Sequence, residues 1–135
     1  MEQTLEAMRE ASKNTMGEAM GIELLELTKT RVVARMPVTP AVKQPFGLLH
    51  GGASVALAET VASIGAWMNV DAATQAAVGL EINANHVRAV REGQVTAVAE
   101  PLHVGRTTQL WAIEIRDEQD RLVCVSRCTM AVVGK

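Results

Sequence analysis

The sequence predicts an α+β fold in which an antiparallel sheet of five or six strands wraps around one long central helix. Two patterns support this prediction. Residues 50–68 are small or apolar almost throughout, as in a buried helix. Several other segments alternate apolar and polar residues with a period of two, as in antiparallel strands that have one covered face. We therefore expect one helix layer packed against one sheet layer.

The first half of the chain is expected to contain a short helix, a hairpin and a loop. Leu5 and Met8 lie on one face of a short amphipathic segment near the N-terminus. Two β-rich runs then form a candidate hairpin, residues 22–27 and 31–38. Several prolines follow, and residues 39–49 are expected to form a loop that leads into the central helix.

The second half begins with the central helix, which is expected to start at Gly51 and to end near residues 69–73. Four alternating segments follow and are expected to be strands: residues 77–89, 94–101, 107–116 and 122–133. In the third of these, Trp111 and Ile113 share one face while Glu114 lies on the other. The apolar face is the one expected to cover the helix.

Length and composition are those of one domain over residues 1–135, with 48% hydrophobic and 21% charged residues. The net charge of −2 and the few aromatic residues provide neither a basic stripe nor a stacking surface for nucleic acid. No stretch reaches about 20 uninterrupted apolar residues, and the N-terminal segment lacks a signal-like apolar region. We expect a cytoplasmic protein that binds neither nucleic acid nor membranes.

Cys124 and Cys128 are four residues apart in an alternating segment, so they lie on the same face of a strand. Two cysteines cannot form a four-thiolate zinc site, and this spacing exceeds the Cα separation that a disulfide allows. The pair is therefore interpreted as small core residues in a reducing compartment.

Glu59 is the one acidic residue in the apolar run 50–68, and His50 at its start is the one basic residue. We expect it to be buried, and an unpaired buried carboxylate is costly unless it is protonated, hydrogen-bonded or paired. The helix offers no lysine or arginine as a partner. A functional role is one explanation, and an ion pair with a residue of another strand is the structural alternative.

Other polar groups are expected to gather near the start of this helix. Ser63 lies one turn after Glu59 on the same face, and the backbone N–H of Gly51 has no intrahelical partner. His50 and Gln44 precede it on the loop. A carboxylate, free N–H groups, an amide and an imidazole suggest attack on a carbonyl. Each group also has an ordinary structural explanation. His50 could cap the helix, the glycine at position 51 could allow a tight turn into it, and Ser63 could donate to a carbonyl of its own helix.

Residues 43–59 and 78–86 together resemble the hotdog-fold acyl-CoA thioesterases of the PaaI-like superfamily. Within them the chain is similar to the subgroup of the Arthrobacter-type 4-hydroxybenzoyl-CoA thioesterase and the 1,4-dihydroxy-2-naphthoyl-CoA thioesterases of menaquinone biosynthesis. A glutamate at position 59, where other relatives have aspartate, favours this aryl-CoA branch. The likeness extends from about residue 16 to residue 133. It implies hydrolysis of an aryl- or acyl-CoA thioester to free acid and CoA, without metal or cofactor, by homodimers that assemble into homotetramers.

The resemblance also implies roles for the site residues, with the active site shared across the dimer interface. The Gly51 N–H of one subunit would hold the thioester oxygen, and Gln44 and His50 would help to place the thioester. Glu59 of the other subunit would attack as nucleophile or act as general base on water, and Ser63 would position that water. The sequence leaves both routes open.

The CoA moiety is implied to lie near the ends of the late strands, where five residues are candidate contacts to its phosphates: His86, Arg88, Arg106, Thr107 and Thr108. The alternatives to a thioesterase are a noncatalytic acyl-CoA binding or sensor module and a hotdog hydratase or dehydratase. The helix lacks the histidine–aspartate pair that the hydratase chemistry requires. The identity of the acyl group, and the choice between CoA and an acyl carrier protein, stay open.

Overall fold

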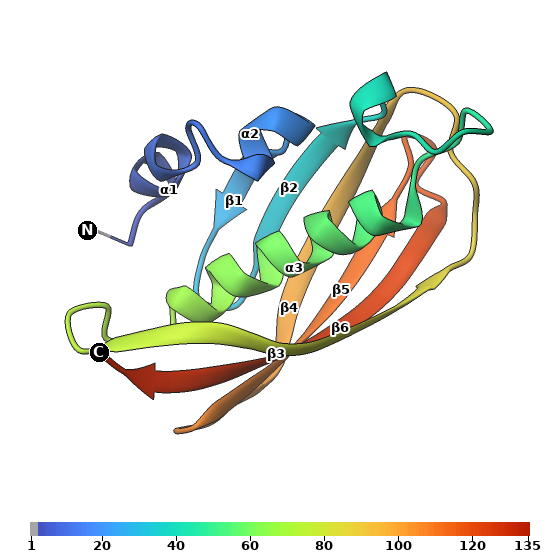
Figure 1. Cartoon of the computed structure of the whole chain (residues 1–135). Helices are drawn as coiled ribbons and strands as arrows, with labels where there is room; N and C mark the ends of the chain where they lie inside the picture. Colours follow the sequence, from blue (N-terminus) through green and yellow to red (C-terminus); the bar gives the residue numbers. More distant parts are fainter. Residues whose placement is uncertain (1–2) are drawn as a thin grey trace.

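The computed structural model describes residues 3–135 and has the predicted α+β arrangement, with α3 lying along a curved sheet (Figure 1). Its elements follow in chain order: α1 (Leu5–Ala11), α2 (Met16–Met20), β1 (Glu23–Leu27), β2 (Val32–Pro37), the 3-10 turn η1 (Pro40–Val42), α3 (Gly51–Trp67), β3 (Gln75–His86), β4 (Gln94–Val104), β5 (Thr108–Arg116) and β6 (Leu122–Gly134).

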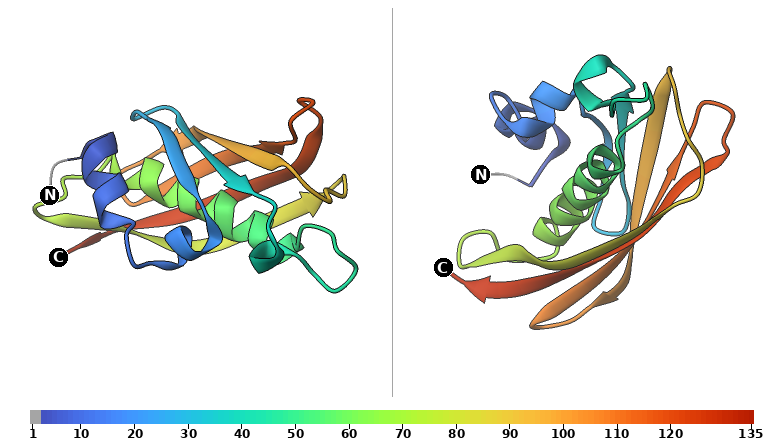
Figure 2. Two further views of the ribbon diagram at one scale, coloured as in Figure 1. Left: turned by 90° about the horizontal axis from the view of Figure 1, so that it is seen from above. Right: turned by 45° about the vertical axis from the view of Figure 1, so that its right-hand side comes forward.

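The strands within the described residues form one antiparallel sheet in the order β1-β2-β4-β5-β6-β3. The predicted hairpin of β1 and β2 is confirmed. The sheet curves around α3, so that both β2 and β3 flank the helix (Figure 2). This order leaves β1 and β3 as the two edge strands, and β3 is the longer of the two.

The core lies between α3 and the inner face of the sheet. Trp111 and Ile113 are fully buried there, as their alternation predicts, and Leu57 of α3 is equally buried. Trp111 packs so closely on Gly65 that a Cβ added to this glycine would lie 2.5 Å from the ring. The Trp111 indole N–H donates to Gln109 Oε1 at 2.9 Å, which satisfies its polar group. A glycine in the last turn of α3 therefore sets the distance between this end of the helix and the sheet.

The central helix ends at Trp67, slightly before the predicted end near residues 69–73. The Asn69 side-chain amide donates to the Gly65 carbonyl at 2.9 Å and to the Lys29 carbonyl at 2.8 Å. Because this side chain takes a carbonyl that a further turn would use, it favours termination. No helix within residues 3–135 is long and apolar enough to cross a membrane.

The N-terminal segment contains α1 as predicted and a second short helix, α2, that the sequence pattern did not predict. Gly21, with φ of 79°, ends α2 in the left-handed conformation. Arg9 of α1 donates to the Leu24 carbonyl of β1 from Nε at 3.0 Å and from Nη2 at 2.7 Å. Gln3 Nε2 donates to the carbonyls of Trp67 and, at 3.0 Å, Val70. These bonds tie α1 to an edge strand and to the end of α3.

Cys124 and Cys128 are free, buried and on the inner face of β6, so their interpretation as core residues is confirmed. Burial, with a smaller contribution from Glu59 and Glu81, raises the pKa of Cys128 to about 11. The thiol therefore stays protonated at neutral pH.

Candidate active site

His50 caps the first turn of α3. Its backbone is extended, with φ of −67° and ψ of 131°, and its Nδ1 accepts the Gly52 N–H at 2.8 Å. The His50 carbonyl accepts the Ala53 N–H at 3.0 Å, which closes the turn. The Gly51 N–H has no hydrogen-bond partner among residues 3–135. One donor is therefore free at the positive end of a 17-residue helix.

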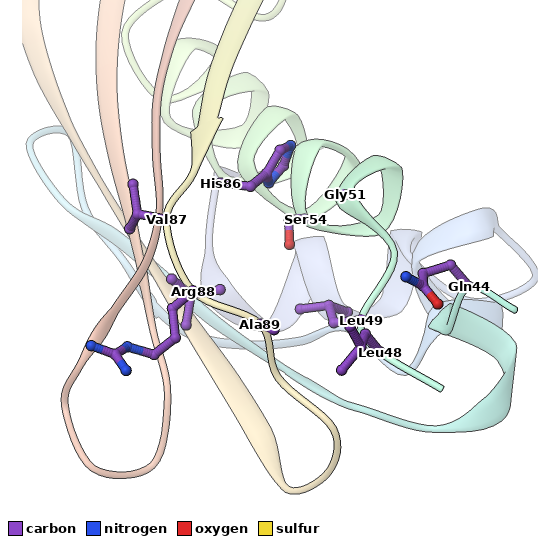
Figure 3. A pocket seen from close by; sticks show the side chains of 10 residues that line it. Gln44, Leu48, Leu49, Gly51, Ser54, His86, Val87, Arg88 and Ala89 are labelled. Atoms are coloured by element: carbon purple, nitrogen blue, oxygen red, sulfur yellow. The ribbon is translucent and has the colours of Figure 1, made fainter. Parts of the chain in front are cut away.

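A cleft of about 410 Å³ opens at this end of α3. Most of its lining comes from the loop before α3, the first turn of α3, and the end of β3 with the residues after it (Figure 3). Val123 of β6 completes the lining. Four of the predicted site residues line this cleft, namely Gln44, Gly51, His86 and Arg88. The fold thus brings together residues that are more than 40 positions apart in sequence.

Gln44 supplies a second donor to the cleft. Its Oε1 accepts the Phe46 N–H within the loop, which leaves the amide Nε2 without a partner among residues 3–135. Two donors, the Gln44 amide and the Gly51 N–H, therefore line one hollow. Such a pair suits a carbonyl oxygen that gains negative charge during a reaction.

His86, predicted as a CoA contact, lies directly beside the start of α3. A Cβ added to Gly51 would be 3.0 Å from His86 Nε2, so glycine leaves the imidazole room. Figure 3 shows His86 pointing toward α3 and Arg88 pointing away from it. His86 is therefore placed beside the Gly51 end of the cleft, and the Arg88 side chain extends away from α3.

Glu59 and Ser63 line a different cleft, of about 530 Å³, on an open stripe of α3 between β3 and the N-terminal helices. The expectation that Glu59 is buried is wrong for the single chain, because Glu59 is exposed. The sheet covers the opposite face of α3 and leaves this stripe open. A Cβ added to Gly79 of β3 would be 3.6 Å from Glu59 Oε1, so the carboxylate lies over the edge strand.

One chain does not bring the carboxylate to the two donors. Glu59 follows Gly51 by eight residues, which corresponds to about 12 Å along the helix axis. The two residues line separate clefts. Four of the five catalytic residues predicted from the sequence are thus divided into two groups within one chain, Gln44 and Gly51 in one and Glu59 and Ser63 in the other. The fifth, His50, caps α3 and is not among the residues that line either cleft.

Arg106, Thr107 and Thr108 lie in the hairpin between β4 and β5, at the far end of the sheet from His86. Thr108 pairs with Ala131 of β6, whereas His86 pairs with Cys124. Seven residues along a strand span about 23 Å. The five candidate CoA contacts are therefore not adjacent in one chain, and their contact with CoA stays a prediction.

Some lining residues escaped the sequence reasoning. Ser54 is 2% exposed and lines the cleft with Gly51. It lies three residues after Gly51, on the same helical face, and this spacing could have identified it. Met8 and Met16 line the Glu59 cleft, and no local pattern connects them to it. Within residues 3–135, no group of three His, Cys, Asp or Glu side chains is arranged to hold a metal ion.

Comparison with known proteins matches residues 46–124 to the thioesterase superfamily. The chain is 62% identical to ComA2 of Bacillus subtilis (strain 168) over 123 residues, which covers 91% of this chain and 98% of that relative. It is 50% identical to the 1,4-dihydroxy-2-naphthoyl-CoA hydrolase of Listeria monocytogenes, with 87% and 95% of the two chains covered.

A crystal structure of a mutant of thioesterase PA1618 from Pseudomonas aeruginosa is similar in fold and in sequence. It superposes with a TM-score of 0.95 at 44% identity, over 98% of this chain and 95% of that one. Agreement over almost the whole chain includes α3 and the complete sheet. The chain therefore belongs to the thioesterase superfamily and is a thioester hydrolase with the hotdog fold.

Proposed function

We propose that the chain hydrolyses aryl- or acyl-CoA thioesters to the free acid and CoA at a site shared by two copies, with Glu59 as the reacting carboxylate. One observation carries the proposal: two free donors, the Gln44 amide and the Gly51 N–H, line one cleft, while Glu59 lies on an open stripe of the same helix. Because about 12 Å separates them in one chain, a second chain must bring the two halves together.

The edge of β3 supports this assembly. β3 lies at the end of the sheet, and its Val78 and Leu80 side chains are 45% and 62% exposed. A long apolar edge offers unpaired backbone groups to another strand. In the proposed homodimer, two β3 strands pair antiparallel about a two-fold axis and join the sheets.

The positions of the two clefts favour one register for this pairing. Glu59 lies over Gly79, and Gly51 lies beside His86. If Gly79 pairs with the partner's His86, the two-fold axis crosses β3 between residues 82 and 83. The partner's Gly51, which lies beside the partner's His86, then comes to the Glu59 carboxylate, and both sites form at once.

The same register also relates the candidate CoA contacts. In one chain Val78 pairs with Ala131, and Ala131 pairs with Thr108. With this axis the partner's Val78 lies opposite Val87, so the partner's Thr108 is three strand spacings away, about 14 Å. We therefore assign the phosphate contacts to Arg88 of one subunit together with the β4–β5 hairpin of the other.

The outer face of the sheet offers a second contact for the proposed homotetramer. Val125 and Val133 of β6 are 38% and 41% exposed, and they alternate with residues that face α3. Two dimers packed through this face would cover these side chains. Light scattering of the purified protein gives the mass that checks both assembly steps.

The proposed reaction begins with the thioester oxygen held by the Gly51 N–H and the Gln44 amide. His50, fixed by its capping hydrogen bond, helps to place the thioester. Glu59 of the other subunit attacks the carbonyl carbon, which forms an acyl-enzyme anhydride and releases the CoA thiolate, and water then cleaves the anhydride. In the alternative route Glu59 takes a proton from a water molecule that attacks directly. Ser63, one turn away, positions the water in either route.

We propose an aromatic acyl-CoA as the substrate class and 1,4-dihydroxy-2-naphthoyl-CoA of menaquinone biosynthesis as the first candidate. The relative from Listeria monocytogenes supports this choice, because it is 50% identical to this chain and is named a 1,4-dihydroxy-2-naphthoyl-CoA hydrolase. Half of the residues that line the cleft next to Glu59 are methionine, alanine, valine or isoleucine, and the only charged one within residues 3–135 is Glu59 itself. Such a lining suits a planar ring better than a charged group.

The direct test measures CoA release from 1,4-dihydroxy-2-naphthoyl-CoA, benzoyl-CoA, a medium-chain acyl-CoA and one acyl carrier protein thioester. Wild type is compared with Glu59→Gln, which keeps the shape of the side chain and removes its charge. We expect turnover by wild type and a loss of most of the rate in a folded variant of unchanged mass. Binding without release would favour a sensor, and an active Glu59→Gln would refute the catalytic assignment.

Subunit mixing tests whether the site is shared. Glu59→Gln and Gln44→Ala each damage both sites of their own homodimer. In a mixed dimer, however, one site receives an intact Gln44 from one chain and an intact Glu59 from the other. Random exchange at equal amounts should therefore restore about one quarter of the wild-type sites. A mixture that stays as slow as the separate variants would show that the two residues act within one chain.

A further inference from the structure

We propose that α1 and α2 form the wall that selects the acyl group, with Met8 and Met16 as its contact residues and Arg9 as the residue that positions it. The inference rests on the proposed function, because the Glu59 carboxylate marks where the thioester carbonyl lies. The cleft that contains Glu59 is bounded on its other side by α1 and α2, which lie beside α3 in Figure 2.

The two walls of this cleft differ in origin, and half of the lining residues are apolar. The N-terminal helices contribute Met8, Ala11 and Met16, and α3 contributes Val55, Glu59 and Ile64. The volume of about 530 Å³ is ample for the acyl half of a thioester, since ligand pockets span roughly 300–1,000 Å³. A smaller hollow of about 310 Å³ continues from it past Ile64 toward Leu24 of β1.

The direction of the acyl group follows from the two sides of α3. Glu59 lies on the β3 side, over Gly79. Ile64 reaches the other side, where it shares a hollow with Leu24 of β1, and it shares two further hollows with Met8 of α1. When the carbonyl of a thioester is held at Glu59, the thioester sulfur points toward the cleft lined by Gly51 and Arg88 of the other subunit. The acyl group therefore extends across the stripe toward Ile64 and Met8.

The N-terminal helices are anchored beside this cleft without filling it. Arg9 holds α1 through two hydrogen bonds to the Leu24 carbonyl, at 3.0 and 2.7 Å. Leu24 lies where the β1–β2 pairing shifts register, which frees that carbonyl on an edge strand. Gln3 bonds to the Val70 carbonyl at 3.0 Å at the other end. The wall is thus held by side-chain hydrogen bonds to backbone carbonyls and by the packing of Leu5 and Met8 against the core.

Methionine suits such a wall. Its unbranched side chain adapts to the shape of a ligand, and its sulfur makes favourable contacts with aromatic rings. Met8 is partly buried, and Met16 is 63% exposed at the mouth of the cleft. The wall therefore favours aromatic acyl groups over short alkyl groups, without fixing one ring system.

The test compares Met8→Ala with Met20→Ala, the same change at another partly buried methionine of this segment that does not line the cleft. For each, kcat/KM is measured with benzoyl-CoA and acetyl-CoA. We expect Met8→Ala to lower the benzoyl-to-acetyl ratio about tenfold, while Met20→Ala keeps it. Met8→Trp, which fills the cleft, should reduce benzoyl turnover more than acetyl turnover.

Arg9 is tested as a positioning residue. Arg9→Gln should raise KM for benzoyl-CoA more than it lowers kcat, and Arg9→Lys, which keeps one donor for Leu24, should restore most of the loss. Equal changes for both acyl groups in every variant would overturn the inference while the proposed function stands. Absence of turnover by wild type with all thioesters would instead overturn the proposed function itself.

Discussion

Replacing Gly51 by proline removes the one backbone N–H that the proposed mechanism uses to bind the thioester oxygen. Proline is tolerated at the first position of a helix. The preceding residue, His50, already has the extended ψ of 131° that a residue before proline requires. The remainder of α3 should therefore form as before. Loss of one oxyanion donor lowers kcat by roughly 10²–10³-fold, equivalent to about 2.7–4 kcal/mol.

Gly51→Ala is the matched control, because alanine adds the same Cβ and keeps the N–H. That Cβ would lie 3.0 Å from His86 Nε2, so the exposed imidazole must shift slightly. Moving one exposed side chain away from its preferred rotamer costs on the order of 1 kcal/mol. We therefore expect Gly51→Ala to lose no more than about tenfold in kcat, well short of the loss in Gly51→Pro.

Steady-state CoA release gives kcat for both variants, and circular dichroism with light scattering verifies fold and mass. A proline variant that is folded and as active as the alanine variant would refute the assignment of the Gly51 N–H. Equal, severe losses in both variants would show that the space beside His86 matters and that the donor does not.

Two further predictions concern the core. In Gly65→Ala the new Cβ would lie 2.5 Å from the Trp111 ring, so urea unfolding should show a loss of about 1–3 kcal/mol in the free energy of unfolding. Gly17→Ala is the control: its Cβ would have no atom nearer than 3.7 Å, so the free energy of unfolding should not fall and should rise by up to about 1 kcal/mol. Burial, and then the nearby glutamates, raises the pKa of Cys128 from 9.0 to about 11. The free energy of unfolding should therefore fall as pH rises from about 9 to 11, because only the unfolded chain ionises this thiol in that range. Alkylation by iodoacetamide at pH 9 measures the ionised thiol, and a folded protein that reacts as fast as the protein in urea would contradict the prediction.

Periodicity predicted the sheet because each strand has one face toward α3. The alternation of Trp111 and Ile113 with Glu114 became burial of the first two residues and exposure of the third. The pattern failed for α2, because a five-residue helix is too short to show a helical period. It also placed the end of α3 too late, since the hydrogen bond from Asn69 to Gly65 depends on a side chain that no periodicity describes.

The candidate site was predictable where residues are close in sequence. Glu59 and Ser63 share a cleft because residues four apart on a helix are neighbours. The contact between Gly51 and His86 was not predictable from spacing, because it depends on how far β3 runs before it passes the start of α3. The sequence pattern also gave the wrong burial for Glu59, because the composition of an apolar helix predicts that its faces are buried but does not identify the element that buries each face.

The sequence by itself determined the local features of this protein: one apolar helix with a lone carboxylate, a glycine at its start, and strands with one apolar face. Those features follow from side-chain periodicity and backbone freedom within a few residues. Only the tertiary structure decided that the donors and Glu59 lie in separate clefts, that β3 is an edge strand, and that the N-terminal helices border the cleft of Glu59. These depend on strand order and register, which contacts between distant residues set.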